Sequence, residues 1–356
     1  MRKKRLFLAL PLTMAFIGLG ATTPQSPDPI DPLFANDQGE TRAVLMIRDG
    51  RVAYKRYAPG YSDQNRFISW SMAKSVTAVL IGELVADGKL QLDGPVPFAE
   101  WQKPGDLRAT ITLRQMLNMS SGLDHTEVGE IIYKSDTNQN LFVGGTNDMA
   151  ARSLAKGLEA KPGVKYEYSS MTSLLLAELI TRQITNSKDP RARARAYTAY
   201  AFEHVFNPAG IKNAVLDFDG AGTQIGGSII YMTLDDWGRF GSLLLDGRGE
   251  DGSQVIAPEW LSFMRTPSKT DSGYGGHVWL NHTRSGEGAK DPALFPGNGP
   301  PSLFSAIGHL GQYVIVSPDQ KLVLVRLGKT NDPDLEPVRK ALGAVVAKIP
   351  EERPDA

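Results

Sequence analysis

The segments of this chain that resemble β-strands occur near its two ends, and the segments that resemble helices fill the middle. An apolar run at 43–47 is followed by Asp49-Gly50 and a second run at 52–57. Asp-Gly between two apolar runs is a strong hairpin signal. The C-terminal third contains further strand-like runs at 274–280, 303–307, 313–317 and 322–327. One sheet therefore has to draw strands from both ends of the chain.

Helical periodicity defines the remaining segments. Apolar residues recur at helical spacing after Ser69, a plausible N-cap, and Asp87-Gly88 provides a stop signal. Further helices are predicted at 113–119, 147–158, 170–185, 193–206, 234–245 and 336–347. We therefore expect an α/β (α+β) fold: an antiparallel sheet flanked by helices, with an inserted all-helical lobe. The sheet lobe would span about 41–95 and 226–348, and the helical lobe about 96–225.

The N-terminus has the layout of an export signal. Four basic residues at 2–5 precede an apolar run from Leu6 to about Ile17, and small residues follow. We interpret 1–21 as a signal peptide and 22–40, rich in Pro and Asp, as a linker. An uncleaved anchor is the alternative, but the run is short and contains Pro11. The expected location is the periplasm or the medium, with no membrane span after cleavage.

Composition excludes several functions. Lys+Arg and Asp+Glu are equal at 39 each, so no bulk charge favours nucleic acid. The chain has no cysteine, which excludes a disulfide, a thiolate zinc site and a catalytic thiol. Histidines other than His309 are scattered without ligand spacing, so neither a metal nor a cofactor is expected. The oligomeric state cannot be read from these residues.

The strongest chemical signal is Ser71-Met72-Ala73-Lys74, an S-x-x-K motif. Residues three apart share one face of a helix, which brings the serine hydroxyl within reach of the lysine amine. Serine is a weak nucleophile that needs a base, and lysine serves as one when burial favours its neutral form. The letters alone are weak, because Ser153-Leu154-Ala155-Lys156 matches too. Nothing around that second copy resembles a site, and we interpret it as a surface helix.

The segment 67–75 resembles the nucleophile segment of the serine β-lactamase-like hydrolases. This group includes class C β-lactamases, D-alanyl-D-alanine carboxypeptidases, family VIII esterases and 6-aminohexanoate-oligomer hydrolases. Segments 117–123 and 233–241 also resemble segments of the group, and the resemblance covers roughly 40–345. It implies a β-lactamase/transpeptidase-like fold and hydrolysis through an acyl-enzyme on Ser71.

The resemblance also assigns further roles. Tyr168, in Tyr168-Ser169-Ser170, matches the tyrosine of the family's second motif and would shuttle protons; Tyr133-Lys134-Ser135 fits the letters but lacks the flanking turn and helix. His309-Leu310-Gly311 matches the third motif. The backbone N–H groups of Ser71 and Gln312 would form the oxyanion hole. His309 would orient substrate or set the charge of Lys74 and Tyr168, with Ser170 and Gly311 lining the substrate site.

Two departures concern the substrate. Leu310 offers no hydroxyl to a substrate carboxylate, and Ser170 replaces an asparagine that binds a side-chain amide in the β-lactam-recognising families. We therefore expect a small linear amide or ester as substrate. The closest match is the 6-aminohexanoate-dimer hydrolase-like branch. A D,D-carboxypeptidase or β-lactamase is the alternative, and a non-catalytic binding protein of the same fold is a second one.

Overall fold

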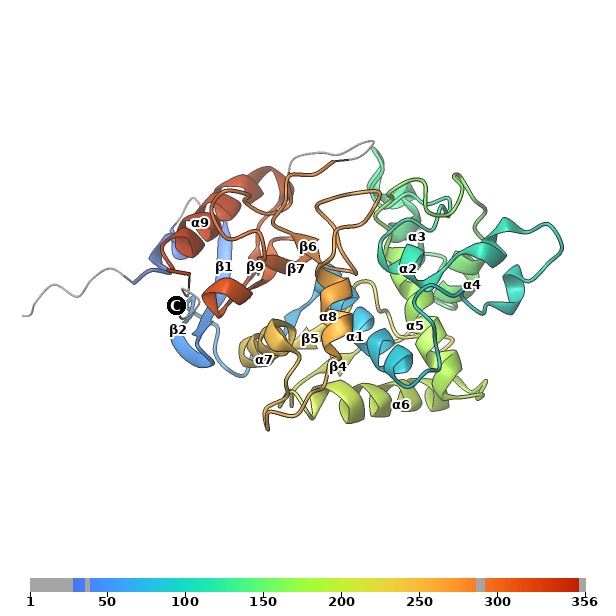
Figure 1. Cartoon of the computed structure of the whole chain (residues 1–356), viewed down its shortest axis with the longest axis horizontal. Helices are drawn as coiled ribbons and strands as arrows, with labels where there is room; N and C mark the ends of the chain where they lie inside the picture. Colours follow the sequence, from blue (N-terminus) through green and yellow to red (C-terminus); the bar gives the residue numbers. More distant parts are fainter. Residues whose placement is uncertain (1–27, 36–38, 286–291, 352–356) are drawn as a thin grey trace, which may run out of the picture.

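The two ends of the chain meet in one antiparallel sheet of strand order β2-β1-β9-β8-β7-β6 (Figure 1). The computed structural model describes residues 28–35, 39–285 and 292–351, so the predicted signal peptide lies outside the described residues. The strands are β1 (Glu40–Arg48), β2 (Arg51–Tyr57), β6 (Trp279–Leu280), β7 (Phe304–Gly308), β8 (Gln312–Ser317) and β9 (Leu322–Lys329). Strand β9, from the end of the chain, pairs with β1, from its beginning. The predicted assembly of the sheet from both ends is confirmed.

Alternating side chains of β9 enter two separate cores, because successive residues of a strand face opposite sides of the sheet. Leu322 and Leu324 pack with the apolar face of α9 (Leu335–Ala347). Val323 and Val325 belong to the larger core on the other face, which includes α7 (Leu234–Asp246). The sheet is therefore covered by helices on both faces, as Figure 1 shows.

Helix α7 approaches the sheet closely at Gly241. A Cβ atom there would lie 2.4 Å from a Val323 methyl carbon and 3.0 Å from one of Val314. Only glycine allows the helix backbone to lie this near the strands. Trp237, one turn earlier and fully buried, then fills the space beside Phe240, with the two ring centroids 6.0 Å apart.

Helices between the two strand groups form a lobe beside the sheet (Figure 1). They are α1 (Ala73–Ala86), α2 (Leu113–Leu117), α3 (Asp136–Phe142), α4 (Met149–Leu154), α5 (Ser170–Ile184) and α6 (Pro190–Ala201). A separate three-stranded sheet of order β3-β5-β4 is formed by β3 (Phe67–Ile68), β4 (Val215–Leu216) and β5 (Ile230–Met232). Helix α8 (Pro258–Arg265) leads back to the large sheet.

Local structure differs from the sequence predictions at several places. The strand expected at 274–280 is only Trp279–Leu280, and the helix expected from 193 begins at Pro190, where the Asp189 side chain caps it. That helix continues into a π-helical turn, Phe202–Phe206. Part of the expected linker packs on the domain: Leu33 of the 3₁₀ turn Asp31–Phe34 is buried with α9. Apolar contacts hold this segment against the domain, and the Pro and Asp residues that predicted a linker gave no indication of them.

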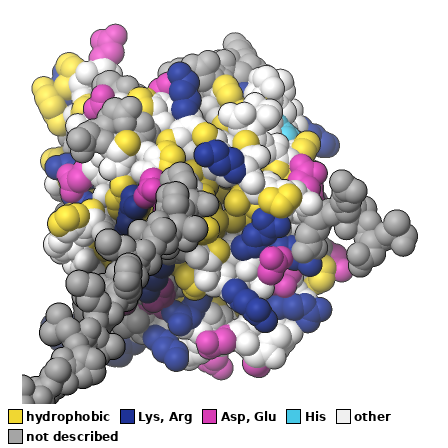
Figure 2. All heavy atoms as spheres, turned by 90° about the vertical axis from the view of Figure 1, so that its left-hand side faces the viewer, with side chains coloured by type: hydrophobic (Ala, Val, Ile, Leu, Met, Phe, Trp, Pro, Cys, Tyr) yellow, Lys and Arg dark blue, Asp and Glu magenta, His cyan; other side chains and the backbone are white. Residues whose placement is uncertain are grey.

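The outer strand β2 is protected by charge. A free strand edge is a template for pairing with another chain, and charged side chains on it oppose such pairing. Three of its seven residues are Arg51, Lys55 and Arg56. Figure 2 shows this end of the molecule, where basic and acidic side chains are interspersed with apolar ones. No helix within the described part of the chain is long and apolar enough to cross a membrane.

Candidate active site

Ser71 lies in a 3₁₀ turn, Trp70–Met72, directly before α1. Trp70 has a φ of +43°, a strained conformation for a residue with a large side chain, and such strain concentrates at functional sites. The predicted N-cap role of Ser69 is wrong, because its hydroxyl bonds to Ser228 O (3.2 Å) and accepts from Ile230 N (3.0 Å). These bonds fix the turn to the segment before β5 and leave Ser71 half-buried at the surface.

Lys74 is a buried residue, 1% exposed, and its amine has three hydrogen-bond acceptors around it. Its Nζ lies 3.1 Å from Ser71 Oγ, 2.8 Å from Ser170 Oγ and 2.7 Å from Gly227 O. These contacts satisfy all three protons of an ammonium, and loss of the proton facing Ser71 leaves a lone pair directed at the hydroxyl. Burial lowers the pKa of Lys74 to about 8, against the opposing charge of Glu127. A substantial fraction is therefore neutral in weakly alkaline solution.

The second S-x-x-K copy has a different environment. Helix α4 ends at Leu154, within the motif. Ser153 is buried and donates to Met149 O at 2.8 Å, whereas Lys156 pairs with Asp136 at 2.9 Å. The expectation of a surface helix is wrong for this serine, but the copy has no nucleophile–base contact.

Tyr168 joins the Ser71–Lys74 pair from the loop before α5. Its hydroxyl interacts with the Ser71 side chain, and Lys74 Nζ lies 4.9 Å from the centroid of its ring. The ring stacks on Trp279 with centroids 5.4 Å apart. Burial, and then the charge of Glu127, raise the pKa of Tyr168 far above its ordinary value, so the phenol is protonated at neutral pH. Tyr133, which fits the same short pattern, is 62% exposed.

Glu127 is a site residue that the sequence analysis did not identify. Its Oε1 accepts from Ser170 Oγ (2.6 Å), and its Oε2 accepts from the Ser170 backbone N–H (2.7 Å) at the start of α5. The Ser170 hydroxyl therefore donates to Glu127 while it accepts from Lys74. The expected substrate contact of Ser170 would compete with these two bonds. No motif marks Glu127, so only tertiary structure reveals its position.

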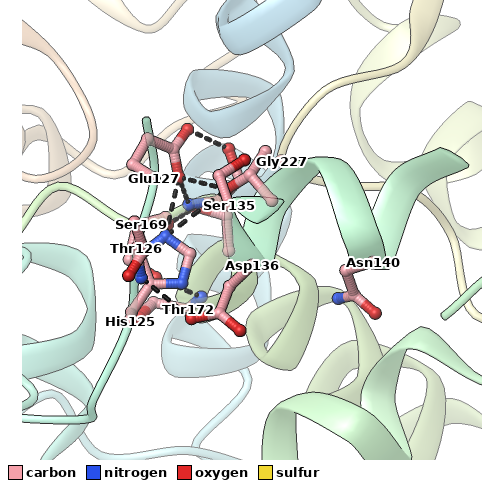
Figure 3. A network of polar contacts seen from close by, with 12 residues as sticks. His125, Thr126, Glu127, Ser135, Asp136, Asn140, Ser169, Thr172 and Gly227 are labelled. Carbon is pink, nitrogen blue, oxygen red and sulfur yellow. Dashed lines mark hydrogen bonds and ion pairs between the residues drawn. The ribbon is translucent and has the colours of Figure 1, made fainter. Parts of the chain in front are cut away.

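Two further side chains contact the Glu127 carboxylate, Thr137 from α3 and His125 from the same loop as Glu127; Figure 3 shows His125 and Glu127. Thr137 Oγ1 donates to Oε2 at 2.7 Å, and His125 Nε2 lies 2.8 Å from the same oxygen. Burial acts to raise the pKa of Glu127, but the hydrogen bond from His125, the charge of Lys74 and the bond from Ser170 outweigh it and hold the pKa at about 2. Glu127 is therefore a carboxylate throughout the physiological range.

The turn between β7 and β8 places the third predicted motif beside the Trp70–Met72 turn that carries Ser71. Gly308 approaches so closely that a Cβ atom would lie 2.2 Å from Ser69 O. Leu310 and Gly311 both adopt positive φ, +61° and +78°. The Gln312 side chain donates to three backbone carbonyl oxygens, those of His309, Leu310 and Gly328. It therefore stabilises the turn, and only its backbone remains to serve an oxyanion.

His309 occupies the rim of the site. Its ring lies edge-on to Trp70 with centroids 5.3 Å apart, and its Nδ1 is 4.0 Å from Asp332 Oδ1. The charge that opposes the lowering of the pKa of Lys74 is that of Glu127, and His309 is not among the groups that set this pKa. Within residues 28–35, 39–285 and 292–351, no three His, Asp or Glu side chains are grouped in a way that could hold a metal ion.

Comparison with known proteins identifies the family to which this fold belongs. The model of the Beta-lactamase family matches residues 30–348. A 6-aminohexanoate-dimer hydrolase of Paenarthrobacter ureafaciens is 21% identical over 304 residues, which cover 83% of this chain and 74% of that protein.

Solved structures of low sequence identity share the fold. A structure from Bacillus anthracis bearing the name 6-aminohexanoate-dimer hydrolase superposes with a TM-score of 0.69 at 20% identity, over 87% of this chain and 80% of that one. The octameric penicillin-binding protein homologue of Pyrococcus abyssi gives 0.63 at 17% identity, over 90% and 76%. A β-lactamase of Mycobacterium bovis gives 0.60 at 19% identity, over 87% and 95%.

Proposed function

The chain belongs to the Beta-lactamase family and is a serine hydrolase, and from this premise we propose that it cleaves a linear amide or ester through an acyl-enzyme on Ser71. The observation that carries the proposal is the 3.1 Å contact between Lys74 Nζ and Ser71 Oγ, made by a lysine whose pKa burial lowers to about 8. A nucleophile and a base within hydrogen-bond reach are what serine catalysis requires.

Acylation begins when neutral Lys74 takes the proton of Ser71. Ser71 Oγ forms a bond to the substrate carbonyl carbon, and the backbone N–H groups of Ser71 and Gln312 receive the developing oxyanion. When the tetrahedral intermediate collapses, the bond from carbon to the amide nitrogen or ester oxygen breaks. The proton held by Lys74 passes to that leaving atom through the Tyr168 hydroxyl, which is protonated and so able to donate.

Deacylation reverses these roles. A water molecule replaces the leaving group, gives its proton to the same Lys74–Tyr168 pair and attacks the acyl carbon. Cleavage of the bond between Ser71 Oγ and that carbon releases the carboxylic acid and returns the proton to Ser71. No group other than water is consumed, so the residues present account for both halves of the reaction.

The substrate we propose is a small linear amide or ester, for which the 6-aminohexanoate dimer is the model compound. The Paenarthrobacter relative is named for this substrate and is 21% identical to the chain, so we propose its substrate as the first amide to test. Leu310 has no hydroxyl for a β-lactam carboxylate, and the Ser170 hydroxyl is already bonded to Lys74 and Glu127. Both observations favour a linear substrate over a β-lactam or a D,D-peptide.

We also propose that the protein is exported, on the basis of residues 1–21. Their basic start and short apolar run are typical of a cleaved signal peptide. Mass determination of the protein recovered from a periplasmic extract of a bacterial host tests this proposal. A mass that lacks the first 20 or so residues supports export, and full-length protein confined to the cytoplasm contradicts it.

Initial rates on a three-substrate panel test the proposed function. The panel contains a short-chain nitrophenyl ester, a linear 6-aminohexanoate dimer and a chromogenic cephalosporin. We expect turnover of the ester or the dimer that disappears in Ser71→Ala, with the cephalosporin the poorest substrate. Ser153→Ala is the matched control, since Ser153 lies in the second S-x-x-K copy and has no lysine contact. Cephalosporin turnover exceeding the other two would favour the β-lactamase alternative, and turnover that persists in Ser71→Ala would contradict the proposal.

A further inference from the structure

Lys74 and Glu127 form an ionic pair on either side of one hydroxyl group. Ser170 Oγ lies 2.8 Å from Lys74 Nζ and 2.6 Å from Glu127 Oε1. Because Glu127 can only accept, the Ser170 proton is directed to it, and the Ser170 lone pair is left for Lys74. The hydroxyl therefore has a fixed orientation, with the carboxylate at one end and the amine at the other.

Most of the other ionisable groups around the pair are neutral. His277, which faces Lys74, has its pKa lowered to about 3 by burial and is neutral. The groups whose charge interacts with Lys74 or Glu127 are, besides each other, His125, Tyr166, Tyr168, Tyr274 and His277. Burial raises the pKa of each of these three tyrosines, so all three are neutral. Glu127 is thus the anion that opposes the Lys74 charge.

We propose that Glu127 is the positioning residue of this hydrolase, which acts through the Ser170 hydroxyl to orient Lys74 and to stabilise the ammonium formed when Lys74 takes the Ser71 proton. The inference rests on the proposed function of Ser71 and Lys74. The logic is that of a catalytic triad, in which a buried carboxylate orients the base and stabilises its protonated form. Here lysine is the base and a serine hydroxyl is interposed.

The rigidity of the network supports a positioning role. Ser170 N–H fixes one carboxylate oxygen to the first turn of α5, and Thr137 of α3 and His125 of the preceding loop contact that same oxygen. The other oxygen faces Ser170 Oγ. A carboxylate held by this many donors cannot rotate away when the charge of Lys74 changes, so its field on the base is constant through the cycle.

The pH dependence of serine labelling distinguishes this role from a structural one. Labelling of Ser71 by a fluorophosphonate is followed from about pH 6 to pH 10, a range that brackets the pKa of Lys74. Ser71 Oγ bonds to phosphorus, fluoride leaves and Lys74 takes the proton. Glu127→Gln removes the anion that stabilises the Lys74 ammonium. The acid limb of the pH–rate profile therefore moves to lower pH by about one unit, which is a tenfold change in the proton affinity of Lys74. The plateau rate falls roughly tenfold or more, because the base is weaker and less well oriented.

Glu159→Gln is the matched control, since Glu159 bonds to exposed Lys165 at 2.7 Å in the same lobe. It should leave the limb and the plateau unchanged. An acid limb that stays at the wild-type pH in a folded Glu127→Gln protein would overturn the inference. If the wild-type protein is not labelled at all, or if labelling survives in Ser71→Ala, the result would instead contradict the proposed function itself.

Ser170→Ala provides an independent test if Glu127→Gln does not fold. We expect the limiting rate constant of labelling to fall tenfold or more, while the half-saturating probe concentration stays near the wild-type value. The limiting rate changes and the half-saturating concentration does not because the Ser170 hydroxyl contacts Lys74 and Glu127 and would not contact the probe. A raised half-saturating concentration with an unchanged limiting rate would identify Ser170 as a substrate contact. It would overturn the proposal that Glu127 acts on Lys74 through the Ser170 hydroxyl.

Discussion

Lys74→Ala is expected to lower the turnover of the best substrate by at least about 10³-fold, because the base that accepts the Ser71 proton is removed. Lys74→Arg should be similarly inactive. Arginine keeps the positive charge, but its guanidinium does not give up a proton at accessible pH. The pair of variants therefore separates a need for charge from a need for a base. Steady-state rates, with folding verified by circular dichroism, provide the measurement.

Lys156→Ala is the internal control for this prediction. Lys156 stands in the second S-x-x-K copy and pairs with Asp136 at the surface of the helical lobe. Its replacement should leave the rate close to that of the wild type. A Lys74→Arg enzyme with substantial activity would show that charge alone suffices and would remove lysine from the role of base.

Trp237→Ala is expected to destabilise the protein by about 3–5 kcal/mol, the range for loss of a large aromatic side chain from a core. Trp237 is fully buried on α7, and its Nε1 donates to Phe67 O at 3.4 Å. The substitution therefore leaves a cavity and frees the strand β3 that leads to Ser71. Thermal unfolding should show a midpoint lower by about 4–7 °C for a chain of this size.

Two further variants make this stability prediction specific. Trp237→Phe keeps most of the apolar volume and should lose less than the alanine variant. Tyr133→Ala removes an aromatic ring that is 62% exposed, and it should change the midpoint little. Equal losses in Trp237→Ala and Tyr133→Ala would contradict the assignment of Trp237 to the core.

Sequence patterns predicted the fold because its largest features are local or periodic. The hairpin at Asp49-Gly50, the strands at 313–317 and 322–327 and the last helix depend on turn chemistry and hydrophobic periodicity, which a single sequence displays. The strand expected at 274–280 failed for the opposite reason. The chain reverses direction within this segment at His277, whose φ is +60°, and Leu280 N–H bonds back to Gly273 O, so Tyr274 packs against Trp279 with ring centroids 4.9 Å apart and no continuous strand forms.

Sequence patterns identified Ser71 and Lys74 but not Glu127, the carboxylate that opposes the charge of Lys74. Ser71 and Lys74 are three residues apart, so helical geometry predicts their contact. Glu127 reaches Ser170 across 43 positions of chain, from a loop with no recognisable motif. The expected influence of His309 on Lys74 followed from the motif alone, whereas the structure places Glu127 in that position. Contacts that depend on how a loop packs are beyond pattern and spacing.

Mass mapping of the fluorophosphonate adduct is the most direct test of Ser71 as the nucleophile. Three serines, Ser69, Ser71 and Ser75, lie within seven residues, which makes the assignment demanding. The hydroxyls of Ser69 and Ser75 are engaged with backbone partners, Ser228 O and His277 O. We predict one adduct per chain, on Ser71, and none in Ser71→Ala. An adduct on Ser69 or Ser75, or one that persists in Ser71→Ala, would contradict the account.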